Sequence, residues 1–132
     1  MHLRYTILYV EDVSASMSFY ENAFGLKRKM LHEAGDYGEL ETGSTVLALS
    51  SRKLLSELGK NPGSPDPERP TFELAFETES VDAALKKAVE AGAFLVQEAK
   101  EMPWGQTTSY VRDIDGFLVE ICSPVTPQKK PG

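Results

Sequence analysis

Two stretches of the chain show the same order of hydrophobic and polar positions. These stretches are residues 5–25 and 73–93. Each opens with a short strand-like run, Thr6–Val10 in one and Leu74–Phe76 in the other. Each then continues into a segment whose apolar residues recur at helical spacing, which predicts a helix with one buried face. Gly25 and Gly92 stand where a helix-ending glycine belongs. The helix starts read Glu11-Asp12-Val13-Ser14 and Glu79-Ser80-Val81-Asp82, and their Asp and Ser oxygens suit the free N–H groups of a first turn.

Three further strand-like runs follow each expected helix. In the first half they are Leu26–His32, Tyr37–Glu41 and Thr45–Ser50, and in the second half Phe94–Ala99, Thr107–Arg112 and Phe117–Cys122. The chain therefore contains one βαβββ unit twice, which predicts an α+β fold built from two tandem modules.

The repeat sets the expected boundaries within a single domain, residues 1–123. The first module covers about 3–51 and the second about 71–123, and a flexible tail follows at 124–132. The stretch 52–70 joins the modules. Its first part, Arg52 to Leu58, can form a short amphipathic helix, whereas the Pro- and Gly-rich remainder cannot hold regular structure.

Composition narrows the class of protein and of partner. The chain has 132 residues, 41% hydrophobic and 26% charged, which is typical of one globular domain. A net charge of −6 disfavours nucleic acid and anionic membranes as partners. The single cysteine, Cys122, excludes an internal disulfide, and no apolar run approaches the about 20 residues that span a bilayer. These features indicate a cytoplasmic protein.

The chain also resembles a known superfamily. The start YTILYVEDVSASMSFYENAFGLK and the ending RDIDGFLVEI, together with the doubled βαβββ pattern, resemble the vicinal oxygen chelate superfamily. This superfamily includes glyoxalase I, the bleomycin- and fosfomycin-resistance proteins and the extradiol dioxygenases. The resemblance covers about residues 3 to 123 and implies an eight-stranded cup with the site inside it. It also implies a homodimer.

Metal-dependent members of the superfamily place a ligand on the first and last strand of each module. The resemblance carries these places onto Tyr5, Ala48, Glu73 and Glu120. At these four positions, in order, a metal-dependent member has His, then Glu or Gln, then His, then Glu. In this chain only Glu120 matches that pattern. Zinc, nickel, cobalt and iron favour nitrogen or thiolate donors beside carboxylate, and the only histidines, His2 and His32, lie elsewhere. We therefore expect no metal and no cofactor, with a divalent metal as the alternative.

Strand alternation places Glu73 and Glu120 on the sides of their strands that point away from the apolar, helix-covered face. In Phe72-Glu73-Leu74-Ala75-Phe76, Glu73 points away from the large apolar residues, and Glu120 shares its face with Leu118 and Cys122. Either the two glutamates are solvated surface residues, or they come close and line a ligand site. In the second case, repulsion and partial burial would raise the pKa of one of them.

Two aromatic residues complete the candidate site. Tyr110 precedes Glu120 by ten positions across the Asp-Ile-Asp-Gly turn, an even separation that predicts both side chains on the same face of the sheet. Trp104, in Met102-Pro103-Trp104-Gly105, lies on a loop and can stack on a flat ligand. The alternatives are a strand-forming tyrosine and a tryptophan that caps the edge of the core.

Two functions are compatible with these residues. The first is a metal-free binding protein for a cationic or neutral aromatic small molecule, with Tyr5, Glu73, Trp104, Tyr110 and Glu120 contacting the ligand. The second is an enzyme, a lyase or isomerase of the lactoylglutathione lyase type or a dioxygenase, in which Glu120 is the catalytic base. We expect binding, because this chain retains a candidate base but lacks the metal donors that the chemistry needs.

Overall fold

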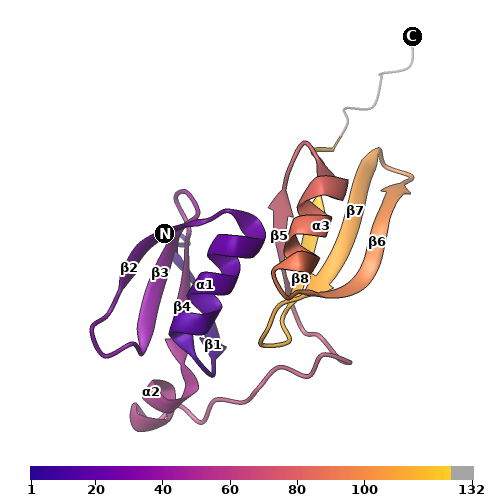
Figure 1. Ribbon diagram of the computed structural model, residues 1–132. Coiled ribbons are helices and arrows are strands. Elements are labelled where there is room, and N and C mark those ends of the chain that lie inside the picture. The colour runs from indigo at the N-terminus through magenta and orange to yellow at the C-terminus, as the bar shows by residue number, and fades with distance from the viewer. Residues whose placement is uncertain (126–132) are drawn as a thin grey trace. The chain divides into compact units, whose positions relative to one another are not determined.

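The computed structural model describes residues 1–125 and contains a four-stranded sheet in each half of the chain (Figure 1). The first half comprises β1 (Tyr5–Val10), α1 (Val13–Phe24), β2 (Lys27–Leu31), β3 (Tyr37–Glu41) and β4 (Val46–Ser51), and α2 (Arg52–Glu57) follows it. The second half comprises β5 (Glu73–Glu77), α3 (Val81–Glu90), β6 (Phe94–Met102), β7 (Gln106–Arg112) and β8 (Leu118–Cys122). The α+β class and the tandem βαβββ pattern are thus confirmed.

The two sheets have the same topology, and the strands that flank β4 and β8 pair with them in equivalent registers. Their strand orders are β1-β4-β3-β2 and β5-β8-β7-β6, with the first pair parallel and the others antiparallel. Equivalent rows across three strands are Ile7, Ala48 and Glu39 in the first sheet and Ala75, Glu120 and Tyr110 in the second. Ala48 is therefore the counterpart of Glu120.

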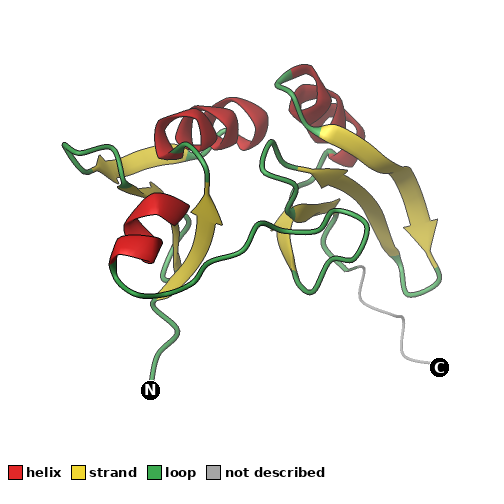
Figure 2. Ribbon diagram, turned by 90° about the horizontal axis from the view of Figure 1, so that it is seen from below, coloured by secondary structure: helices red, strands yellow, loops and turns green. Residues whose placement is uncertain are grey.

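Each long helix covers one face of its own sheet (Figure 2). In the second sheet, Val119 and Ile121 are 0% and 1% exposed and lie on the α3 side. Alternation along β8 then places Glu120 on the opposite face, which we call the open face. In the first sheet, Gly38 lies under α1, where an added Cβ would come within 2.9 Å of Met17 Sδ.

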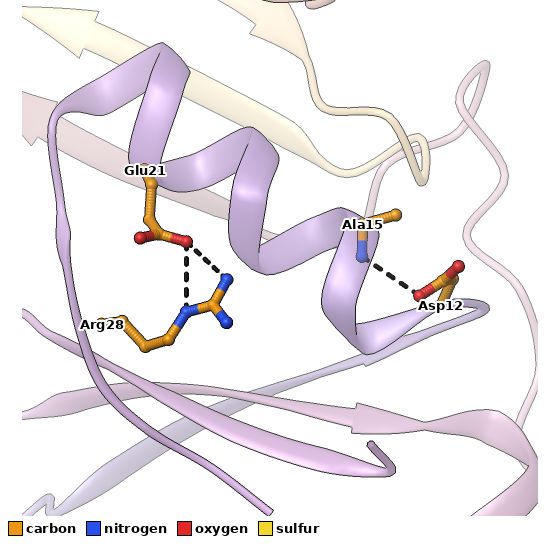
Figure 3. A network of polar contacts seen from close by, with 4 residues as sticks. All are labelled: Asp12, Ala15, Glu21 and Arg28. Carbon is orange, nitrogen blue, oxygen red and sulfur yellow. Dashed lines mark hydrogen bonds and ion pairs between the residues drawn. The ribbon is translucent and has the colours of Figure 1, made fainter.

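The ends of α1 are closed by side chains and by one glycine. Asp12 Oδ1 accepts from the Ala15 N–H at 3.1 Å (Figure 3). Gly25 ends the helix with a φ of 68°. Arg28 of β2 donates twice to Glu21 Oε1, at 2.6 and 3.2 Å, and so ties this strand to the helix. The expected capping residue of α3, Ser80, makes no side-chain cap.

Two compact units divide the chain between Pro65 and Asp66, inside the joining stretch predicted at 52–70. Helix α2 belongs to the first unit, where Ser51 Oγ caps it by accepting from the Leu54 N–H. Within residues 1–125, none of the helices is long and apolar enough to cross a membrane. The predicted tail lies outside the described residues from 126 onward, and the joining of the two sheets into one cup stays a prediction.

Candidate functional site

Three of the residues singled out from the sequence meet on the open face of the second sheet. Tyr110 of β7 and Glu120 of β8 are directly opposite in the ladder, and the Tyr110 hydroxyl donates to Glu120 Oε2 at 2.5 Å. Glu73, from β5 on the other side of β8, is paired with Leu118, so it is a diagonal neighbour of Glu120 on the same face of the sheet. The strand parity predicted for these three residues is confirmed, whereas their role in binding stays a prediction.

The neighbouring Glu120 changes the acid–base properties of Glu73. Burial, followed by the charge of Glu120 and the hydrogen bond to it, raises the pKa of Glu73 above its ordinary value. The hydrogen bond to Glu120 and then burial raise the pKa of Tyr110, which therefore remains a phenol that donates at neutral pH. This direction agrees with the sequence-based expectation for two neighbouring glutamates, and the ligand site itself stays a prediction.

Cys122 lies beside Glu120 on this face but is suited to packing, not to nucleophilic chemistry. Its side chain is 5% exposed, and burial, together with the neighbouring Glu120, raises the pKa of the thiol to about 11. Its Sγ lies 3.6 Å from the Phe76 carbonyl oxygen. A neutral, covered thiol is a poor nucleophile, because the thiolate is the reactive form.

The carboxyl pair has no basic partner in the described part of the chain. Within residues 1–125, no Lys, Arg or His nitrogen lies within 4.0 Å of a Glu73 or Glu120 oxygen. Arg112, on the same face of β7, instead pairs with Glu68 at 3.7 Å and stacks over the Phe94 ring at 5.2 Å. Within the described residues, Glu73 and Glu120 are therefore left without a counterion at ion-pair distance.

Trp104 lies in the turn between β6 and β7 and is 46% exposed, which excludes a fully buried core position. Its indole Nε1 donates to Gln106 Oε1 at 2.7 Å, and Gln106 Nε2 donates to the Ser123 carbonyl oxygen at 3.0 Å. Sequence reasoning missed Gln106. The only signal was its position two residues after Trp104, at the start of the strand that carries Tyr110.

The first module holds a different polar cluster on the corresponding face. The Tyr37 hydroxyl donates to Glu39 Oε2 at 2.7 Å, and Lys29 Nζ lies 3.8 Å from Glu39 Oε1. Burial and then the bond to Glu39 raise the pKa of Tyr37. Tyr5, on β1, is 47% exposed and makes a small electrostatic contribution to this shift. Alternation along β3 could have revealed the Tyr37–Glu39 pair, which the sequence analysis did not single out.

The residues at the four metal-ligand positions do not fit a transition metal. Ala48 has no donor atom and is 0% exposed, and neither His2 nor His32 stands at a ligand position. His32 lies past the end of β2, where its Nδ1 accepts from the Ala34 N–H at 3.2 Å. No three His, Cys, Asp or Glu side chains gather closely enough to hold a metal within residues 1–125. A phenol, a methyl group and two carboxylates lack the nitrogen or thiolate donors that zinc and nickel favour.

Comparison with known proteins places these observations in a family. Residues 3–126 match the family model described as a glyoxalase-like domain. The lactoylglutathione lyase of Neisseria meningitidis serogroup A is 31% identical over 144 residues, covering 100% of this chain and 94% of the relative.

Solved structures agree with the fold. A glyoxalase-related enzyme from Fulvimarina pelagi superposes with a TM-score of 0.81 at 24% identity, covering 94% of this chain and 88% of that one. A glyoxalase/bleomycin resistance protein/dioxygenase family enzyme from Burkholderia phytofirmans PsJN also gives 0.81, at 20% identity, over 96% of this chain and 100% of that one. At these identities the likeness shows the fold alone.

Proposed function

Because the chain belongs to the glyoxalase-like domain family, we propose that it keeps the family scaffold as a metal-free protein that binds cationic or neutral aromatic small molecules. The observation that carries this proposal is the Glu73–Glu120 pair, which the strand register places as diagonal neighbours on the open face, with no Lys, Arg or His nitrogen within 4.0 Å in residues 1–125. Two adjacent carboxyl groups without a counterion favour a ligand that brings positive charge.

The residues around the pair suggest how such a ligand is held. An ammonium group can donate to Glu73 and to the Glu120 oxygen that does not accept from Tyr110. Charge-assisted bonds of this kind contribute about 1.5–3 kcal/mol each when shielded from water. Trp104 and the Tyr110 ring supply apolar area for a flat hydrocarbon part, which also accounts for binding of neutral aromatic molecules.

The test compares ligands that share one ring and differ in charge. We expect calorimetry to show 2-(2-naphthyl)ethylamine binding more tightly than 2-(2-naphthyl)ethanol, and 3-(2-naphthyl)propionate binding least. Glu73→Gln and Glu120→Gln should each weaken the amine by about tenfold, the equivalent of one lost charge-assisted bond. Glu90→Gln, an exposed glutamate at the end of α3, is the matched control and should leave the affinity unchanged. Tighter binding of the acid, or indifference to both site substitutions, would overturn the proposal.

The 31% identity with a lactoylglutathione lyase supports a second candidate, a lyase or isomerase of that type. Glu120, the one ligand position that this chain retains, would then be its catalytic base. The measurement that separates the candidates is elemental analysis of the purified protein, followed by an assay of the methylglyoxal–glutathione adduct with added nickel or zinc. One metal ion per chain, with turnover lost in Glu120→Gln, would establish the lyase and refute metal-free binding.

A further inference from the structure

The turn that carries Trp104 has a defined backbone. The Gly105 N–H donates to the Met102 carbonyl oxygen at 3.0 Å, and Gly105 has a φ of 83°, a left-handed conformation that favours glycine. Trp104 is thus held at a fixed place between β6 and β7, and only its side-chain torsions remain to be set.

Gln106 restricts those torsions, because both ends of its amide are engaged. Its Oε1 accepts from the Trp104 indole N–H at 2.7 Å, and its Nε2 donates to the Ser123 carbonyl oxygen at 3.0 Å. A carbonyl can only accept and an indole N–H can only donate, so a single orientation of the amide satisfies both partners. The amide therefore cannot flip without losing two hydrogen bonds.

The anchor at Ser123 is itself tied to the sheet. The Ser123 N–H donates to the Thr107 carbonyl oxygen at 2.9 Å, and the Thr107 N–H donates to Ser123 Oγ at 2.8 Å. Gln106 and Thr107 begin β7, the strand that also carries Tyr110. A short chain of hydrogen bonds thus connects the indole to the strand ends beside the candidate site.

This arrangement determines what the indole can offer a ligand. Its N–H is already used inside the protein, so the ring contributes its π face and apolar area and not a hydrogen-bond donor. A side chain that is ordered before binding loses less conformational entropy when a ligand arrives, which raises affinity. Trp104 as a whole is 46% exposed and can accept a partner.

We propose that Gln106 is a positioning residue that holds Trp104 in place for stacking against the flat part of the ligand. This inference rests on the proposed function, and it specifies the ligand further: the part that meets Trp104 is a planar ring that requires no acceptor facing the indole N–H. Gln106 acts through Trp104 and need not touch the ligand.

The first experiment needs no ligand, since Trp104 is the only tryptophan in the chain. In Gln106→Leu, we expect stronger acrylamide quenching and lower steady-state anisotropy of the tryptophan emission than in the wild type. Gln97→Leu, a matched change on β6, should leave both signals unchanged, and far-UV circular dichroism verifies that each variant folds. Emission from Gln106→Leu that matches the wild type would refute the positioning role, whether or not a ligand binds.

The second experiment measures the effect on binding with 2-(2-naphthyl)ethylamine as the probe. Gln106→Leu should weaken the probe about three- to tenfold, the cost of ordering one side chain on binding. In the Trp104→Phe background, which lacks the indole N–H, the same substitution should have little further effect, because the two changes break one interaction. Additive losses would refute the inference while leaving the proposed function intact, whereas a wild-type protein that binds none of the aromatic probes would refute the proposed function itself.

Discussion

The hydrogen bond between Tyr110 and Glu120 provides a direct measure of how strongly the candidate site is organised. Tyr110→Phe removes the hydroxyl that donates to Glu120 Oε2 at 2.5 Å and leaves the ring in place. A hydrogen bond to a charged group contributes about 1.5–3 kcal/mol, and both residues are half-buried, so solvent screens part of this value. We expect the free energy of unfolding to fall by about 1–2 kcal/mol, a sizeable share of the about 5–15 kcal/mol typical of a domain.

Urea denaturation followed by circular dichroism measures this difference, provided that the slope of the transition is unchanged. Tyr5→Phe removes a hydroxyl from an exposed tyrosine and should change stability by less than about 0.5 kcal/mol. Tyr37→Phe, which breaks the bond to Glu39 in the first module, should resemble Tyr110→Phe. A Tyr110→Phe protein as stable as Tyr5→Phe would show that the phenol and the carboxylate do not form this bond in solution.

Gly38→Ala should destabilise the protein by about 1–3 kcal/mol, seen as a lower thermal midpoint, because the new Cβ would lie 2.9 Å from Met17 Sδ. An unchanged midpoint would show that Met17 moves aside freely. Glu73→Gln should stabilise the protein at pH 7, because a raised pKa means that the ionised side chain is disfavoured in the folded state. This gain in stability should shrink as the pH falls below 4.5, the ordinary pKa of glutamate. A gain that does not change with pH would contradict the argument. Finally, we expect a homodimer, and sedimentation of a concentration-independent monomer would contradict it.

Most of the fold followed from alternation and helical spacing, because each sheet has one covered face and each long helix one apolar face. The structure departs from the expected elements where pairing with a neighbouring strand extends a strand beyond its apolar residues. Strand β6 continues to Met102, beyond the expected end at Ala99, since Lys100, Glu101 and Met102 pair with the first residues of β7. These residues are mostly polar and exposed, so nothing in their own pattern indicates a strand.

The candidate site was partly accessible from the sequence for the same reason. Parity alone places Tyr110 and Glu120 on one face, because an antiparallel hairpin keeps the register of its turn. The two hydrogen bonds of the Gln106 amide could not be predicted from the sequence, since they depend on the geometry of a turn and on a carbonyl seventeen residues away. The charge balance of Glu39 likewise depends on Lys29, a residue of a neighbouring strand.

The order of strands within each sheet determines when that sheet can form while the chain is being synthesised. In both modules the last strand to be made is an inner one: β4 lies between β1 and β3, and β8 lies between β5 and β7. During synthesis, β1 has no strand to pair with until β4 has emerged from the ribosome. All four strands of the first sheet are then present, so this sheet can form without any residue of the second. The second sheet closes only when Leu118–Cys122 have emerged. A chain that stops short of Leu118 would keep an intact first sheet but leave β5 with no strand beside it.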